Sequence, residues 1–207
     1  MILAIDTSAG TDIALVNAQT RQVLAEVREP NPRHHAEVIG DGIARVLQHA
    51  DIAVADISEV VCGMGPGPFT GLRVGVAAAR TFAFARAVPL RPMPSHDAIA
   101  REWRCANAEY TGAIAVLTDA RRRELALTRY PAGIAEVGGF ELVSPDDVDE
   151  LLGEARRVDA AQVSAAHLAL AWCERRDRGA SPAADEILYS RAPDAKPGAV
   201  PKRVSGK

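Results

Sequence analysis

The first part of the chain alternates short apolar runs with polar turns and then changes to a helical spacing. Apolar runs at residues 2–5, 13–16 and 23–27 predict three strands joined by tight turns. After the break at Asn31-Pro32, apolar residues recur every three or four positions, which predicts a helix over residues 35–50. A meander of strands therefore precedes the first helix.

A second unit of strand, glycine-rich loop and helix follows. Residues 60–62 predict a strand that leads into the loop, and an almost wholly apolar helix then runs to about Ala85. A short strand is predicted at residues 88–90, and Ser95 begins a helix that reaches about Cys105. Strands and helices in this order are typical of an α/β lobe with a mixed sheet.

The second half of the chain begins like the first half and is shorter. It predicts strands at residues 113–117, 125–130 and 140–143, and helices at residues 145–156 and 165–176. The similar opening indicates an internal duplication with a shortened second copy. We therefore predict an N-terminal lobe, a C-terminal lobe and a basic, mobile tail, at residues 1–107, 108–195 and 196–207.

The segment from Gly63 to Arg80 reads GMGPGPFTGLRVGVAAAR and is the most informative part of the chain. Gly65 and Gly67 let the backbone approach a phosphate closely, and Thr70 is placed to cap the following helix. The segment lacks both the Gly-Lys-Ser/Thr ending of a Walker loop and a strict GxGxxG. A phosphate-binding loop and a tight strand-to-helix turn without a ligand both fit this pattern.

Small residues recur every four positions along the helix after this loop, at Gly71, Gly75, Ala79 and Ala83. Such a stripe favours the close approach of another helix. Most of the remaining circumference is apolar, which predicts burial on nearly all sides, within one lobe or against another subunit. Arginines interrupt a run that is already short for a bilayer, so we expect no membrane span.

Composition and charge describe an ordinary protein of the cytoplasm. The 207 residues carry a net charge of −3, which provides no electrostatic footprint for independent binding to nucleic acid. Cys62, Cys105 and Cys173 lie far apart in the sequence and predict buried thiols, with no disulfide or zinc framework. The N-terminal MILAID lacks the basic region of a signal peptide and is predicted to be a strand.

Four segments together carry a family resemblance. They are ILAIDTSAGTDIALV near the N-terminus, GPGPFTGLRVGVAAAR in the middle, the hairpin around TDARRRELAL, and the late LYSRAPD. Over essentially its whole length the chain resembles the bacterial tRNA threonylcarbamoyladenosine biosynthesis family TsaB, formerly called YeaZ. The resemblance implies an α/β fold that is actin-like (ASKHA, ribonuclease H-like) and two-lobed, with mixed sheets.

The resemblance also implies a function. Members of this family are catalytically silent paralogues of TsaD, the subunit that transfers threonylcarbamoyl to adenosine 37 of tRNAs that read ANN codons. We therefore expect a non-catalytic subunit that binds and activates a TsaD-like enzyme, with a TsaE-like ATPase joining them. ATP and metal are expected to belong to these partners, tRNA to be reached only through the complex, and the chain alone to form a homodimer.

The candidate catalytic residues depart from the catalytic paralogue. That paralogue carries an HxxxH pair that holds a metal, whereas here Ala100 stands where the second imidazole would be. We therefore expect no metal site, and we expect His96 to face solvent or the first turn of its helix and to be dispensable. The possible remnant of a phosphate site consists of Asp6, Thr7, Ser8, Gly65, Gly67 and Thr70.

Two of these positions leave a choice of role. In actin-like kinases a glycine usually stands where Ser8 is, and the serine side chain crowds an approaching phosphate. Asp6 is placed to position a metal-bound water, or to hydrogen-bond the adjacent loop, which we favour. The arginines at residues 121–123 are interpreted as a solvated cluster at a hairpin turn, with docking to tRNA or to a partner as the alternative.

The partner interface is predicted on the two helices at residues 35–50 and 71–85. The first would contribute Ile39, Ile43 and Val46, and the second Gly71, Leu72, Gly75, Val76 and Ala79. Two rival functions use other residues. A self-sufficient actin-fold phosphotransferase would need Asp6 and is disfavoured by Ser8 and the short second half, while a metallopeptidase-like hydrolase is disfavoured by Ala100.

Overall fold

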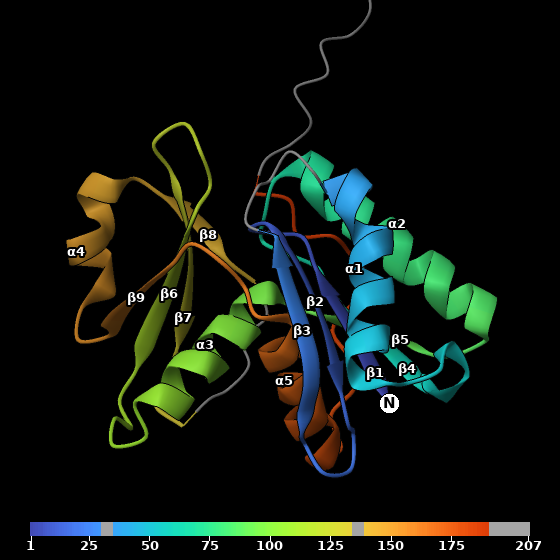
Figure 1. Cartoon of the computed structure of the whole chain (residues 1–207). Helices are drawn as coiled ribbons and strands as arrows, with labels where there is room; N and C mark the ends of the chain where they lie inside the picture. The colour runs from blue at the N-terminus through green and yellow to red at the C-terminus, as the bar shows by residue number, and fades with distance from the viewer. Residues whose placement is uncertain (30–34, 134–138, 191–207) are drawn as a thin grey trace, which may run out of the picture.

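The molecule contains two mixed sheets, and helices pack against each of them (Figure 1). The structure is a computed structural model that describes residues 1–29, 35–133 and 139–190. The first sheet has the strand order β3-β2-β1-β4-β5. Its strands are β1 (Ile2–Asp6), β2 (Thr11–Val16), β3 (Val23–Glu29), β4 (Glu59–Gly63) and β5 (Leu90–Met93). The predicted α/β class with mixed sheets is confirmed.

Helices α1 (His35–Ala50) and α2 (Phe69–Arg86) cover one face of the first sheet (Figure 1). They bury the side chains of alternate strand residues, such as Leu3, Ile5 and Ile13, which share one apolar core with both helices. A short 3₁₀ helix (Val54–Asp56) leads from α1 into β4. The bounds predicted for α1 agree with the structure, and α2 begins earlier than the predicted cap at Thr70.

The second sheet repeats the strand order of the first without a counterpart of β5. Its order is β8-β7-β6-β9, with β6 and β7 antiparallel and β6 and β9 parallel. Its strands are β6 (Ile114–Asp119), β7 (Leu125–Tyr130), β8 (Glu141–Val143) and β9 (Arg156–Ala160). A 3₁₀ turn (Pro145–Asp147) and α4 (Val148–Leu152) connect β8 to β9. This arrangement agrees with a duplicated unit that is shorter in its second copy.

Helices α3 (Ser95–Ala106) and α5 (Ala165–Asp177) lie between the two sheets (Figure 1). Residues of both helices share one apolar core with Ile2 and Val61 of the first sheet and Val116 of the second. Glu59 of β4 anchors α5, because its carboxylate accepts hydrogen bonds from Trp172 at 3.1 Å and from Arg176 at 2.9 Å. The two lobes are therefore joined through a continuous interior.

Two sequence predictions need correction. The helix predicted over residues 145–156 is wrong, because the structure has a 3₁₀ turn, the short α4 and then β9. Strand β5 begins at Leu90, two residues later than predicted. The boundary at residue 107 separates the two sheets, yet α5 returns to the first sheet, and residues 188–190 pair with the glycine loop. The tail over residues 196–207 lies outside the described residues.

No helix in the part of the chain that the structure describes is long and apolar enough to cross a membrane.

Candidate functional site

The turn after β1 places Asp6, Thr7 and Ser8 at the carboxyl end of a buried strand. The Asp6 carboxylate accepts hydrogen bonds from the Ser8 backbone N–H at 2.8 Å, from the Ser8 hydroxyl at 2.5 Å and from the Ser95 hydroxyl at 2.6 Å. Asp6 and Ser8 are buried. Asp6 thus hydrogen-bonds its own loop and the start of α3, which is the second of the two roles that the sequence leaves open.

Gly63 ends β4 directly beside this carboxylate. A Cβ atom at Gly63 would lie 1.8 Å from Oδ2 of Asp6, far inside any van der Waals contact. The backbone of β4 can pass the carboxylate only because residue 63 has no side chain. The same close approach brings Ser95 of α3 within hydrogen-bonding distance of Asp6. This glycine therefore serves the packing of three segments.

The glycine loop after β4 binds the last described segment of the chain. Leu188 donates its backbone N–H to the Met64 carbonyl at 2.7 Å and accepts from the Gly67 N–H at 3.3 Å, and Ser190 donates its N–H to the Gly67 carbonyl at 3.0 Å. The Tyr189 ring lies 4.9 Å from the Phe69 ring at the start of α2. The backbone N–H of Gly67, a residue of the possible phosphate-binding loop, is therefore hydrogen-bonded within the chain.

Thr70 does not cap α2. The helix begins at Phe69 after Pro68, and Thr70 is an exposed residue of its first turn. The hydroxyl that binds α2 is that of Thr7, which donates to the Gly71 carbonyl at 2.8 Å. The capping prediction is wrong because the cap position is Pro68, whose backbone is extended and which directly precedes the helix.

A cavity of about 160 Å³ separates this turn from the second lobe. Ser8, Ala9 and Pro68 line one side, and Thr118, Asp119, Arg121, Ala160 and Ala161 line the other. Asp119 and Arg121 are the charged residues among them. A single arginine beside a carboxylate provides little net attraction for a polyphosphate.

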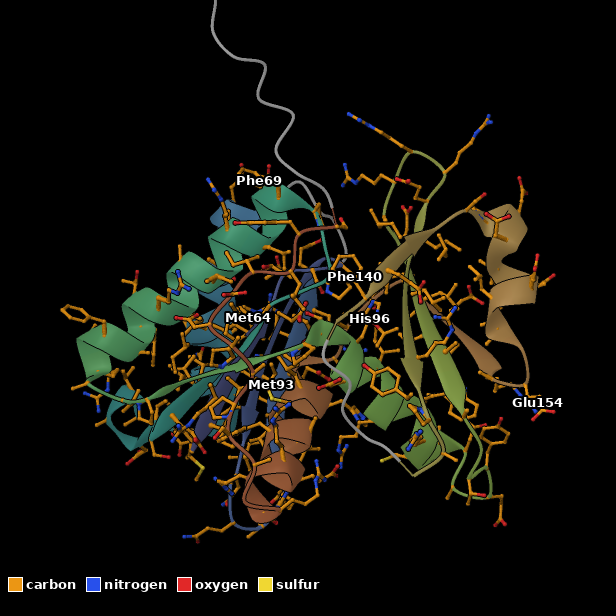
Figure 2. All side chains as sticks on the ribbon, turned by 180° about the vertical axis from the view of Figure 1, so that it is seen from behind. Met64, Phe69, Met93, His96, Phe140 and Glu154 are labelled. Carbon is orange, nitrogen blue, oxygen red and sulfur yellow. The ribbon has the colours of Figure 1, made fainter. Side chains whose placement is uncertain are left out.

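His96 is the clearest departure from expectation. The sequence predicted that His96 faces solvent or lies in the first turn of its helix. It does lie in the first turn of α3. Its side chain is only 1% exposed, so the prediction that it faces solvent is wrong. Figure 2 shows it at the junction of the two lobes. Its Nδ1 lies 2.8 Å from the Thr128 hydroxyl oxygen and its Nε2 lies 2.9 Å from that of Thr118. Burial lowers the pKa of His96 to about 3.

The hydrogen bonds around His96 define its tautomer. The Thr128 hydroxyl donates to the Gly139 carbonyl at 3.2 Å, so it has no proton left for the imidazole. Nδ1–H therefore donates to Thr128, and Nε2 accepts from Thr118. This arrangement requires a neutral ring that ties α3 to β6 and β7.

Within residues 1–29, 35–133 and 139–190, no three His, Cys, Asp or Glu side chains gather closely enough to hold a metal ion. Ala100 is buried one turn after His96, on the side of α3 that meets α5. Cys62 and Cys173 are buried, but Cys105 is exposed, so the prediction of three buried thiols is wrong for Cys105.

The residues predicted for the partner interface face the inside of their own lobe. Leu72, Val76 and Ala79 are at most 2% exposed, Ile39 and Val46 are buried, and Ile43 is half-buried in the same core. Gly71 and Gly75 are buried as well, and Gly75 lies against Thr7. The small residues of α2 therefore permit close contact with the chain's own β1–β2 turn, and a partner would contact the opposite face of the helix.

Arg121, Arg122 and Arg123 form the exposed turn between β6 and β7. All three have left-handed backbone conformations, with φ between 53° and 64°, which non-glycine residues rarely adopt. The Arg121 N–H donates to the Asp119 carboxylate at 2.8 Å, which helps to hold the turn. The solvated cluster agrees with this exposure, and docking stays an alternative.

Sequence reasoning missed several residues that build this region. Thr118, Thr128 and Tyr189 supply hydroxyl and ring contacts. Ser95, predicted only as the start of a helix, supplies a hydroxyl that donates to Asp6. A hydroxyl at the end of a strand or at the start of a helix is a common capping feature, so the sequence carried no signal that was specific to them.

Comparison with known proteins relates the chain to tRNA modification. A family model described as "TsaD: tRNA N6-adenosine threonylcarbamoyltransferase" matches residues 22–158. The uncharacterized protein Rv3421c of Mycobacterium tuberculosis H37Rv is 38% identical over 96% of this chain and 95% of its own length. The tRNA threonylcarbamoyladenosine biosynthesis protein TsaB of Bacillus subtilis is 34% identical over 65% of this chain.

Coverage of these relatives differs. The match to the B. subtilis protein spans 58% of its length. The uncharacterized protein ML0378 of Mycobacterium leprae is 34% identical over 95% of this chain, and the match spans 56% of its length. Among solved structures, YeaZ from Pseudomonas aeruginosa superposes with a TM-score of 0.73 at 21% identity, over 91% of this chain and 97% of that chain. The fold of this chain is therefore the YeaZ fold.

Proposed function

Since the chain belongs to the TsaD family of tRNA N6-adenosine threonylcarbamoyltransferases, as a protein of the TsaB (YeaZ) type, we propose that it is a non-catalytic subunit of the modifying complex. It binds and activates a TsaD-like enzyme for threonylcarbamoylation of adenosine 37 in tRNAs that read ANN codons. A TsaE-like ATPase joins the complex, and tRNA is reached through it. ATP and metal belong to the partner subunits, and the chain alone forms a homodimer.

The observation that carries this proposal is the use of the glycine loop by the chain itself. Residues 188–190 form hydrogen bonds with the N–H and carbonyl groups of Gly67. The Asp6 carboxylate accepts hydrogen bonds from Ser8 and Ser95. Backbone donors and a carboxylate bind phosphate or a metal-bound water only when they point into an accessible site. Here both are part of the internal packing, which supports a non-catalytic role.

We expect no ATP hydrolysis by the purified chain with magnesium. The reason is that phosphate would have to displace the Leu188 carbonyl from Gly67, and a magnesium-bound water would have to displace the two serines from Asp6. Release of inorganic phosphate is the measurement, with Asp6→Asn as the comparison and circular dichroism as the control for folding. Steady turnover that disappears in a folded Asp6→Asn variant would contradict the non-catalytic role.

The partner surface is the outward face of α1 and α2. Phe84 is 90% exposed on α2, and large exposed apolar side chains mark interaction sites when they stand on a face suited to packing. Gly40 and Ala44 of α1 and Ala77 of α2 are exposed and small, which permits the close approach of partner helices. A paralogue with the same fold presents matching helices, so a bundle with near two-fold symmetry is the natural contact.

Phe84→Glu is expected to weaken binding to a TsaD-like enzyme roughly thirtyfold or more, the range of an aromatic hot spot. Because the ring is exposed in the monomer, the change should leave the thermal midpoint of unfolding of the free chain within a few degrees. Leu142→Glu is the matched control, since Leu142 is 41% exposed on the second sheet. Calorimetric titration of each variant with the enzyme provides the affinities.

Activity of the complex tests the same proposal. Added to a TsaD-like enzyme, a TsaE-like ATPase and threonylcarbamoyl-adenylate, the wild-type chain should raise the yield of modified tRNA nucleoside, and Phe84→Glu should not. If the enzyme reaches the same yield without this chain, the activating role is wrong. If Phe84→Glu and Leu142→Glu bind equally well, the helical surface is wrong.

A further inference from the structure

The turn between β6 and β7 carries three consecutive exposed arginines, Arg121, Arg122 and Arg123. Its backbone is fixed from within, because the Ala120 N–H donates to the Glu124 carbonyl at 3.0 Å and the Glu124 N–H donates to the Arg121 carbonyl at 3.1 Å. Figure 1 shows this hairpin reaching past the other strands of the second sheet. Residues 121–123, the arginine turn, are therefore an ordered and accessible part of the surface.

Positive charge is in excess at the arginine turn, although the chain as a whole is acidic. The net charge of the 207 residues is −3. The flanking Asp119 and Glu124 offset part of the charge of the turn, but the arginines outnumber these carboxylates. Ion pairs between exposed side chains are weak, so a partner with many negative charges can bind the arginines in place of the neighbouring carboxylates.

A second basic segment of the chain begins across the cavity beside this turn. Pro68 and Arg121 line opposite sides of the cavity of about 160 Å³ between the lobes. Ser190, the last described residue, donates its N–H to the carbonyl of Gly67, which precedes Pro68. The sequence that follows Ser190 contains five lysines or arginines and one aspartate. This basic sequence therefore begins on one side of the cavity, and the arginine turn stands on the other.

The conformation of the arginine turn favours an extended anion. Residues 121–123 have left-handed φ values between 53° and 64°, and neighbouring residues in a helical conformation do not share a face. The three guanidinium groups therefore suit separate phosphates along a nucleic-acid strand better than one small anion. Guanidinium groups form bidentate hydrogen bonds with phosphate, and such contacts dominate the affinity of proteins for nucleic acid.

The arginine turn lies apart from the proposed partner surface. Figure 1 shows α1 and α2 on the first lobe, whereas the turn belongs to the second lobe. An enzyme that binds α1 and α2 therefore contacts the chain away from this turn. The family model and the B. subtilis relative are named for the modification of tRNA, so RNA is the polyanion that such a complex would hold.

We propose that the arginine turn contacts the phosphate backbone of the tRNA that the complex holds. This inference rests on the proposed function, because the negative net charge of the chain gives it little affinity for RNA on its own. Contacts with phosphates position a nucleic acid and carry no sequence information. The turn therefore helps to position the tRNA, and the choice of the modified adenosine is made elsewhere in the complex.

The affinity of the assembled complex for tRNA tests this proposal. The double variant Arg122→Gln/Arg123→Gln, combined with a TsaD-like enzyme and a TsaE-like ATPase, should bind tRNA about tenfold more weakly than wild type at about 0.15 M salt. The slope of the logarithm of the binding constant against the logarithm of the salt concentration should become shallower by roughly 0.7–0.9 for each phosphate contact that is lost. Fluorescence anisotropy of labelled tRNA at several salt concentrations measures both quantities.

The matched control removes two arginines from the other end of the same sheet. Arg156→Gln/Arg157→Gln changes the net charge equally. Arg156 is paired with Ile114 at the start of β6, whereas the arginine turn follows the end of β6. The control should therefore bind tRNA like wild type. If the double variant at the turn fails to fold by circular dichroism, Arg123→Gln alone replaces it and should weaken binding about threefold.

Two outcomes would overturn this proposal alone. The first is a folded variant of the turn whose complex binds tRNA with the affinity and salt dependence of wild type. The second is a variant that loses binding to the enzyme or to the ATPase in the absence of tRNA, which would make the turn a protein-docking surface. Failure of the proposed function would overturn both proposals and has a different signature, because the wild-type chain itself would then not raise the yield of modified tRNA nucleoside.

Discussion

Gly75→Ala is expected to lower the free energy of unfolding by about 2–4 kcal/mol, although alanine is the better helix former. A Cβ atom at Gly75 would lie 2.1 Å from Oγ1 and 2.8 Å from Cγ2 of Thr7. The contact is buried on both sides, so α2 must move away from the β1–β2 turn. That movement also breaks the hydrogen bond from Thr7 to the Gly71 carbonyl. Urea denaturation followed by circular dichroism measures the change.

Gly40→Ala is the matched control on the neighbouring helix. A Cβ at Gly40 meets nothing within 4 Å, so this substitution should raise the free energy of unfolding by about 0.5–1 kcal/mol through helix propensity alone. Thr7→Ala removes the atoms that collide with residue 75 and should recover part of the loss in the double variant. Equal effects at Gly40 and Gly75 would refute the close contact between α2 and the β1–β2 turn.

This expectation shows what a small-residue stripe can and cannot predict. The spacing of Gly71, Gly75 and Ala79 predicted the close approach of another helix. A close neighbour is present at Gly75, but it is Thr7 of the chain's own β1–β2 turn. Small side chains on the surface of a helix determine how closely a neighbour can approach it. Which segment becomes that neighbour is determined by tertiary packing. The predicted interface residues therefore lie inside the lobe.

Other elements escaped prediction for a different reason. In β9 only Val158 is buried, because the strand pairs with β6 at the edge of its sheet and carries Arg156, Arg157 and Asp159 outward. Such a strand has no alternating pattern to detect. The segment at residues 188–190 binds the glycine loop through backbone atoms, and backbone hydrogen bonds of this kind leave no trace in side-chain periodicity.

Replacing His96 should change the pH dependence of folding. Burial lowers its pKa from 6.5 to about 3, so between these values the unfolded chain binds a proton that the folded chain does not. Stability therefore falls as the pH falls through this window. From about pH 7.5 to about pH 5 the loss due to this one group is about 2 kcal/mol.

His96→Gln separates this effect from other titrating groups. Burial also raises the pKa of Asp12 to about 8. The folded state then holds a proton there that the unfolded state loses above about pH 4, so this group lowers stability as the pH rises. The Asp12 contribution is the same in wild type and in His96→Gln, so it cancels when their free energies of unfolding are compared. Between about pH 7.5 and about pH 5, the wild-type free energy of unfolding should fall by about 2 kcal/mol more than that of His96→Gln.

Two further variants complete this test. His96→Ala leaves a cavity and removes the partner of two buried threonine hydroxyls, so it should cost about 3 kcal/mol or more near neutral pH, contrary to the expectation that His96 is dispensable. His49→Gln, at an exposed position of α1, is the control for the substitution itself. Denaturant melts at each pH provide the free energies. A His96→Gln protein with the same pH profile as wild type would mean that His96 is not held neutral between Thr118 and Thr128.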